Sequence, residues 1–112
     1  MSIDCLFCDI ISGSEPDRII SEDANQEFLL VEDAHPEGAI HWLAIPRKHV
    51  ESTEAMEIEQ PEQLLRLVQF AITQTKQQME KYPILANGFT IKFHFGPYET
   101  IPHAKLHVVS TE

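Results

Sequence analysis

The stretch IPHAKLHVV at residues 101–109 holds the most chemically suggestive residues of this sequence. In an extended strand alternate side chains share a face, so His103, Lys105 and His107 would lie together, opposite an apolar set. A histidine nitrogen can attack a phosphorus centre, and neighbouring N–H donors can balance the charge that develops. Lys92 and His94, on a neighbouring candidate strand, extend the same polar face. The pattern favours phosphate chemistry, although a solvated polar strip on a half-exposed sheet is its commoner origin.

Two cysteines near the N-terminus have the spacing Cys5-x-x-Cys8, which is common in zinc sites. A second CxxC is absent from the sequence, so two further ligands must come from distant histidines, and His49 and His103 are the candidates. On spacing alone, two alternatives remain open. The cysteines can be small, partly buried residues of a short helix, or a redox-active dithiol.

Composition narrows the class of protein. The chain has 112 residues, enough for one modest core, and a net charge of −10. That charge disfavours nucleic acid and anionic membranes as partners, but it permits a small phosphorylated ligand in a locally basic pocket. The N-terminus lacks a basic region followed by an apolar core, and no apolar run reaches membrane-spanning length. We therefore expect a cytoplasmic protein consisting of a single domain over residues 1–112.

Hydrophobic spacing predicts an α+β domain with an antiparallel sheet. The one long helix begins at Pro61, which suits a first helical position, and its apolar residues follow helical spacing. The segment GFTIKFHF alternates strictly, with its phenylalanines and Ile91 on one face. The expected elements are a short helix over 5–12, strands near 18–21, 26–32 and 40–45, a helix over 61–82, and strands over 88–95 and 103–109.

Three segments together resemble the histidine triad (HIT) family of nucleotide-binding proteins. They are CLFCDIISGSEP, HPEGAIHWLAIPRKHV and ETIPHAKLHVV, in the order that the family has them, and they cover nearly the whole chain. The resemblance implies a sheet of about five antiparallel strands with one long helix and a short N-terminal helix. It also implies a purine nucleotide or related phosphate as ligand, and a homodimer.

The resemblance also assigns roles to individual residues. In zinc-containing branches, the positions of Cys5, Cys8, His49 and His103 bind the metal, which makes structural zinc the expected cofactor. Asp33 corresponds to an acidic residue on the ribose hydroxyls, and His41 to a histidine behind the triad. His107 matches the third triad histidine, and Thr100 a phosphate-binding hydroxyl. Lys105 stands at the position of the nucleophilic central histidine.

Three departures from the family pattern bear on activity. Lys105 replaces the nucleophile, His94 falls near a position usually held by asparagine, and Glu99 stands where many members have glutamine. A lysine amine with the ordinary pKa of about 10.4 is almost fully protonated at neutral pH, whereas a neutral imidazole is available to attack. We expect a nucleotide-binding protein whose catalysis is weak or lost, with Lys105 holding a phosphate as a cation. The alternative is an active nucleotidyl hydrolase or transferase.

Overall fold

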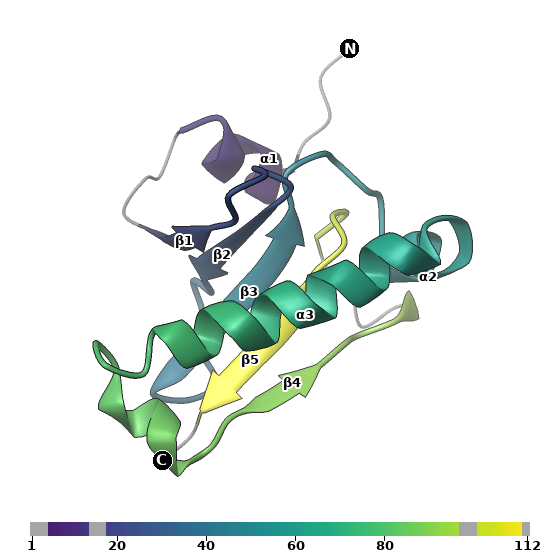
Figure 1. Cartoon of the computed structure of the whole chain (residues 1–112). Helices are drawn as coiled ribbons and strands as arrows, with labels where there is room; N and C mark the ends of the chain where they lie inside the picture. The colour runs from purple at the N-terminus through teal and green to yellow at the C-terminus, as the bar shows by residue number, and fades with distance from the viewer. Residues whose placement is uncertain (1–4, 14–17, 97–100, 111–112) are drawn as a thin grey trace.

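Five strands form one antiparallel sheet in the computed structural model, which describes residues 5–13, 18–96 and 101–110 (Figure 1). The spatial order is β1-β2-β3-β5-β4, so the strand nearest the C-terminus lies between β3 and β4. This confirms the predicted α+β fold class. The strands are β1 (Ile19–Glu22), β2 (Phe28–Glu32), β3 (Ile40–Pro46), β4 (Thr90–Lys92) and β5 (Leu106–Ser110).

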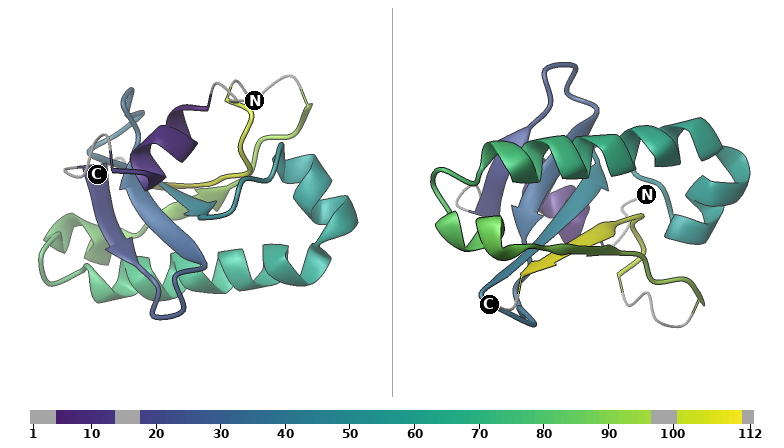
Figure 2. Two further views of the ribbon diagram at one scale, coloured as in Figure 1. Left: turned by 90° about the horizontal axis from the view of Figure 1, so that it is seen from above. Right: turned by 60° about the horizontal axis from the view of Figure 1, so that its bottom comes forward.

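Helices cover both faces of the sheet. Figure 2 shows the long helix α3 along one face and the short helix α1 on the other. None of the helices in the described part of the chain is long and apolar enough to cross a membrane. The helices are α1 (Leu6–Ile11), α2 (Thr53–Glu59), α3 (Pro61–Gln77) and the 3₁₀ helix η2 (Pro83–Asn87).

The alternation of side chains in β2 and β3 creates two apolar layers. Leu30, Trp42 and Ala44 pack with the α3 side, together with Phe70 and Leu67 and the apolar face of β5. The intervening residues of the same strands pack with α1, in a cluster formed by Phe7, Ile10, Leu29, Val31, Leu43 and Ile45. His41 and His107 alternate with the residues of the first layer, so they belong to the α1 side of the sheet.

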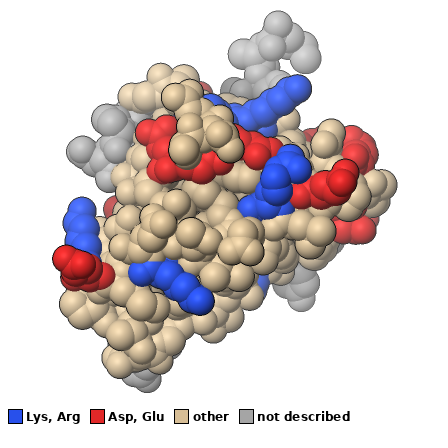
Figure 3. Space-filling view, viewed as in Figure 1, with Lys and Arg blue, Asp and Glu red and all other residues tan. Residues whose placement is uncertain are grey.

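The face over α3 carries charges of both signs. Figure 3 shows acidic and basic side chains close to one another on this face rather than one continuous basic area. Arg66 of α3, for example, donates two hydrogen bonds to Glu27, at 2.8 and 3.2 Å. This distribution agrees with the acidic composition and gives a polyanionic partner no continuous binding surface on this face.

The helix α3 begins at Pro61, as predicted, but the segments before and after it differ from the sequence prediction. The helix α2, which was not predicted, precedes α3, and Gln60 separates them with an extended φ of −138° and a ψ of 57°. Pro61 explains this break, because proline disfavours helical geometry in the residue before it. The predicted helical end at residue 82 is wrong. The helix α3 ends at Gln77 and continues as turns that pack Tyr82 against Trp42, with ring centroids 5.1 Å apart.

The last two strands are shorter than predicted, for one reason. Residues 101–105 leave the sheet through a turn in which the His103 N–H donates to Ile101 O, and Ala104 then donates to Val50 O. The strand β5 therefore starts at Leu106, and β4 ends at Lys92, opposite His107, because the residues that follow Lys92 soon have no strand beside them to pair with. Phe95, which lies beyond the end of β4, is 41 % exposed. The alternative of a solvated polar strip on a half-exposed sheet does not hold, because residues 103–110 are all buried.

Thr53 secures the backbone at the point where β5 begins. Its hydroxyl accepts a hydrogen bond from the Lys105 N–H at 3.3 Å and donates to the Lys105 carbonyl at 3.2 Å. The side chain is fully buried at the first position of α2, where Ser52 caps the helix by accepting from the Ala55 N–H. Thr53 thus serves Lys105 as a strand partner would.

Replacing Thr53 with valine should destabilise the protein, because valine keeps the shape but leaves a buried N–H and carbonyl without these bonds. We expect Thr53→Val to lower the free energy of unfolding by about 2–3 kcal/mol in urea denaturation. The control is Thr73→Val on the partly exposed side of α3, whose hydroxyl accepts from Gln69 and whose loss should cost about 0.5 kcal/mol or less. Equal losses in the two variants would contradict this role.

Candidate functional site

The first candidate site gathers Cys5, Cys8, His49 and His103 from three segments of the chain. Cys5 caps α1, Cys8 lies in its first turn, His49 follows β3 and His103 precedes β5. Cys8 Sγ lies 3.2 Å from His49 Nδ1 and 3.6 Å from His103 Nδ1, and all four donor atoms are within 4.8 Å of one another. Zinc bound tetrahedrally holds sulfur and nitrogen ligands about 3.6 Å apart. The donor types and spacing fit a closed zinc site.

Hydrogen bonding leaves the Nδ1 atom of His103 available as a metal ligand. Nε2 lies 2.8 Å from the carbonyl oxygen of Pro46, which can only accept, so Nε2 carries the proton. The Nδ1 lone pair then faces the Cys5 sulfur at 3.4 Å. Burial lowers the pKa of His103 to about 4, with His49 and Lys105 adding to the effect, so the ring is neutral. A backbone acceptor on the outer nitrogen is the usual support of a metal-binding histidine.

The thiol of Cys8 responds to the same burial. Desolvation, followed by the nearby Cys5 thiol, raises the pKa of Cys8 to about 11 in the metal-free protein. A bound cation reverses this effect because it stabilises thiolates, so metal binding here would release protons.

The second candidate site consists of Asp33, His41 and His107, from the end of β2, from β3 and from β5. His41 Nε2 lies 2.9 Å from His107 Nδ1 and 3.4 Å from Asp33 Oδ2. The two histidines are buried, whereas the Asp33 side chain is 20 % exposed. The structure thus brings together three residues that the family resemblance assigns to nucleotide binding. We call this group the relay.

The relay is a chain of hydrogen bonds with a defined direction. The backbone N–H of Glu37 donates to His41 Nδ1 at 3.0 Å, so that nitrogen holds no proton and the neutral ring carries it on Nε2. His41 Nε2–H then donates to His107 Nδ1, which leaves the His107 proton on Nε2. The three donor atoms lie within 4.8 Å of one another, but a protonated Nε2 cannot coordinate a cation. The relay therefore does not fit a metal ion.

The N–H at the end of the relay is buried. His107 Nε2 has no hydrogen-bond partner among the residues that the structure describes. The His94 ring packs edge-on against the His107 ring, with centroids 4.4 Å apart. Burial lowers the pKa of His107 to about 4, and His94 and His41 contribute, so the ring stays neutral at physiological pH. Leaving a buried N–H without an acceptor costs about 1–3 kcal/mol of folding free energy. A ligand oxygen that accepts a hydrogen bond from this N–H would recover that energy.

Lys105 lies between the two candidate sites. Its side chain is buried, its Nζ donates to the Ile101 carbonyl at 3.0 Å, and the same atom lies 5.7 Å from the Phe7 ring centroid. Beside burial, its charge is among the causes that lower the pKa of both His103 and His107. Lys105 therefore binds its own main chain and adds positive charge beside the relay.

Some site residues could not be found or tested. The predicted Glu99 and Thr100 lie outside the described residues. Glu37 and Pro46 were missed, because they act through backbone atoms and their side-chain types give no signal. Thr53 was missed as well, since an isolated threonine in a sequence has nothing to mark it as a partner of Lys105.

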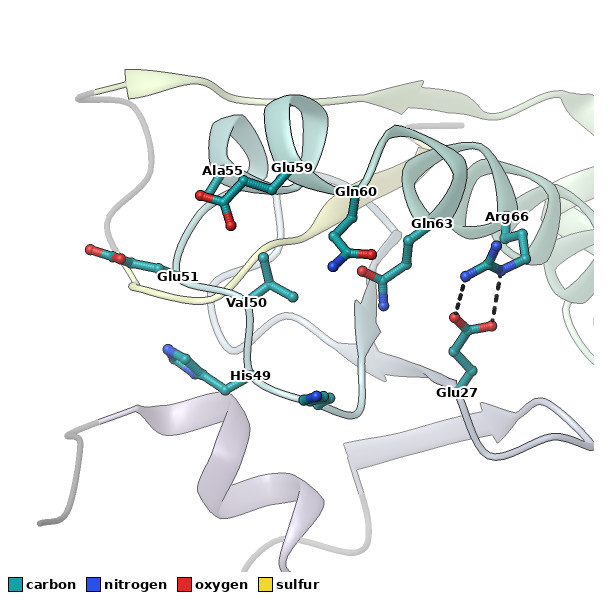
Figure 4. A pocket seen from close by; sticks show the side chains of 10 residues that line it. Glu27, His49, Val50, Glu51, Ala55, Glu59, Gln60, Gln63 and Arg66 are labelled. Atoms are coloured by element: carbon teal, nitrogen blue, oxygen red, sulfur yellow. Dashed lines mark hydrogen bonds and ion pairs between the residues drawn. The ribbon is translucent and has the colours of Figure 1, made fainter.

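A cavity of about 460 Å³ opens beside the first site, between the segment after β3 and the start of α3 (Figure 4). Of the predicted site residues, only His49 lines it. Figure 4 shows the Arg66–Glu27 ion pair at one end and Gln60 and Gln63 extending from the helices. The cavity does not coincide with the predicted nucleotide cleft around His41 and His107.

Comparison with known proteins identifies the family. Residues 4–112 match the family described as scavenger mRNA decapping enzyme C-term binding. An uncharacterized HIT-like protein from Mycobacterium tuberculosis is 32% identical over 108 residues, covering 94% of this chain and 69% of that protein. The chain belongs to the histidine triad family. The sequence resemblance is thereby confirmed.

Further HIT relatives support the fold. Adenosine 5'-monophosphoramidase HINT3 from Mus musculus is 26% identical over 112 residues, which cover 95% of this chain. The chain spans only 62% of that relative's length. The structure of a HIT family hydrolase from Clostridium thermocellum superposes with a TM-score of 0.78 at 21% identity, covering 100% of this chain and 94% of that one. At this identity the superposition shows the shared fold alone.

The relay predicts acid sensitivity of this HIT domain. The pKa of His107 is about 4 in the folded protein, against 6.5 ordinarily. The unfolded chain therefore binds the proton first, and the free energy of unfolding falls as pH drops from about 6.5 to 4. Below about pH 4 both states are protonated and this residue contributes no further loss. The loss from His107 is up to about 3 kcal/mol.

Urea denaturation at several pH values between 7 and 4 measures this contribution. The variant His107→Gln should show a shallower pH dependence than wild type. His35→Gln, which replaces an exposed histidine, should retain the wild-type dependence. If His107→Gln and wild type lose stability equally on acidification, His107 is not the group responsible.

Proposed function

We propose that this HIT domain binds a nucleoside phosphate at the relay and that its hydrolytic activity is weak. The observation that carries the proposal is the buried His107 Nε2–H, which has no acceptor among the described residues and lies beside the positive charge of Lys105. A phosphate oxygen is an acceptor of the right charge for this position. The name of the mouse relative, an adenosine 5'-monophosphoramidase, supports an adenosine phosphate as ligand.

The other relay residues suit the remaining parts of such a ligand. Asp33 is partly exposed, and its carboxylate can accept from ribose hydroxyls, as the family resemblance implies. One carboxylate oxygen already accepts from the His35 N–H at 2.8 Å, which fixes the orientation of the group. His94 packs edge-on against the His107 ring, with centroids 4.4 Å apart, and the His107 Nε2–H is the donor that we expect to bind a phosphate oxygen.

Lys105 is the reason for expecting weak chemistry. In nucleotidyl transfer a nitrogen lone pair forms a bond to phosphorus while the leaving group departs with the former bonding electrons. A protonated amine has three N–H groups and no lone pair. The Lys105 Nζ directs one N–H to the Ile101 carbonyl, so the group is arranged as a donor. As a donor it can bind phosphate, whereas attack would require both deprotonation and a change of direction.

Restoring histidine at position 105 should raise turnover. We expect Lys105→His to hydrolyse adenosine phosphoramidate about 10²- to 10³-fold faster than wild type, because an ordinary lysine amine is neutral at pH 7 in roughly one molecule in a few thousand. Lys105→Ala should be as slow as wild type. Calorimetry with adenosine and guanosine monophosphate should show binding to the wild-type protein.

Two results would contradict the proposal. Wild-type turnover as fast as that of Lys105→His, and abolished in Lys105→Ala, would establish the lysine as a working nucleophile and the alternative of an active hydrolase. No heat of binding at millimolar nucleotide would exclude the binding role. Thermal melting of each variant checks that the fold is retained.

We also propose that Cys5, Cys8, His49 and His103 hold one structural zinc ion. The donor spacing and the free Nδ1 of His103 support this. The four ligands leave no open position, so the ion would act as a cross-link and not as a Lewis acid. It would connect α1, the segment after β3 and residues 101–105.

Metal analysis tests the zinc site. After purification without chelators, wild type should contain about one zinc per chain, and Cys8→Ser should lose it and melt at least about 10 °C lower. Asp33→Asn is the control, since the relay does not fit a metal, and it should keep its zinc. A metal-free wild-type protein, or stoichiometric zinc in Cys8→Ser, would contradict the proposal.

A further inference from the structure

The loop between β2 and β3 controls the direction of the relay. It is closed at its base by the Asp33 N–H, which donates to the His41 carbonyl at 2.9 Å. Within the loop, the His35 N–H donates to Asp33 and the Glu37 N–H donates to His41 Nδ1. The last bond keeps the proton of His41 on Nε2, and Asp33 Oδ2, 3.4 Å from Nε2, favours the same tautomer. The Glu37 N–H thus favours the arrangement in which His107 carries its proton on Nε2.

An ion pair connects this loop to the far edge of the sheet. Lys92 Nζ donates to Glu37 Oε1 at 2.8 Å, and Lys92 lies directly opposite His107 in the pairing of β4 with β5. The hydrogen bond from Lys92 lowers the pKa of Glu37, so the carboxylate is charged at neutral pH. The pair thus spans from the strand beside His107 to the residue that donates to His41.

We propose that Lys92 and Glu37 are positioning residues that hold the relay in one tautomer, with the His107 proton on Nε2. The ligand consequence rests on the proposed function: His107 then offers a donor to a phosphate oxygen, and the other tautomer offers it a lone pair instead. Without the pair, the loop no longer fixes the Glu37 N–H on His41 Nδ1. The proton of His41 can then occupy Nδ1, and Nδ1 of His107 loses its donor.

The partial exposure of the Lys92 and Glu37 side chains distinguishes a positioning role from a general contribution to the stability of the fold. The Lys92 side chain is 35% exposed and that of Glu37 is 50% exposed. Exposed ion pairs contribute little to the stability of a fold. A tautomer ratio is more sensitive, because losing a single ordinary hydrogen bond shifts it about two- to tenfold. Removing the pair should therefore change the tautomers without a matching change in melting temperature.

Nitrogen-15 NMR of histidine side chains tests the proposal in the ligand-free protein. His41→Gln and His107→Gln assign the two ring signals. Wild type should show both rings only with the proton on Nε2, and Lys92→Gln should show mixed tautomers. Lys92→Arg, which keeps the positive charge, should retain the wild-type pattern. The charge reversal that combines Glu37→Lys with Lys92→Glu should also show it, because the two charges are again opposite. Arg66→Gln, which removes the exposed Arg66–Glu27 pair from the α3 side, is the matched control and should leave the pattern unchanged.

Binding of adenosine monophosphate provides the second measurement. Lys92→Gln should weaken it about two- to tenfold, and the charge reversal should restore it. Wild-type rings in mixed tautomers, or a Lys92→Gln pattern identical to wild type, would overturn the positioning role. Failure of wild type to bind nucleotide would overturn the proposed function alone, since the tautomers are measured without ligand.

Discussion

The hydrogen bond from His103 to the Pro46 carbonyl is the constraint on which the functional side of this HIT domain depends. It holds the ring against the end of β3, with the other nitrogen facing the two thiols. Residues 101–105 consequently turn away from the sheet, β5 starts at Leu106, and β4 loses its partner after Lys92. The same turn places the Lys105 carbonyl where it accepts a hydrogen bond from Thr53. It also places the Lys105 amine where it donates to the Ile101 carbonyl. This buried ring thus lies at the turn where β5 begins and where Lys105 leaves the sheet.

Two histidine clusters in this small domain have opposite chemistry because their outer partners differ. At His103 the Pro46 carbonyl accepts a hydrogen bond from Nε2–H, which leaves the Nδ1 lone pair facing the cysteines. At His41 an N–H donor occupies Nδ1, which sends a proton toward His107. Counting nitrogen, sulfur and oxygen donors would assign a metal to both. The backbone groups behind the rings distinguish a ligand set from a hydrogen-bond relay.

The sequence predicts those features that depend on periodicity or on side-chain type. The buried strands and the long helix follow from apolar spacing, and the HIT family follows from its motifs. The short β4 and the buried environment of Lys105 could not be predicted, because both depend on the turn that residues 101–105 make. The end of α3 could not be predicted either, because the turns after it pack Tyr82 against Trp42. Glu37 acts through its N–H, which every residue except proline possesses. The homodimer and the cytoplasmic location stay predictions, since they concern a second copy and a cell.

The acidic composition limits how such a domain can hold an anionic ligand. A net charge of −10 opposes phosphate at long range, so affinity must come from donors at short range, within a Debye length of about 8–10 Å. The relay supplies a neutral N–H whose ring cannot take up a second proton until the pH approaches its lowered pKa of about 4. This donor is already desolvated, so it loses no hydrogen bond to water when a ligand oxygen binds to it. Lys105 then adds one local charge, and the half-buried Lys92 keeps its charge paired with Glu37. If the proposed function holds, the orientation of neutral donors, more than accumulated positive charge, would reconcile an acidic protein with a phosphate ligand.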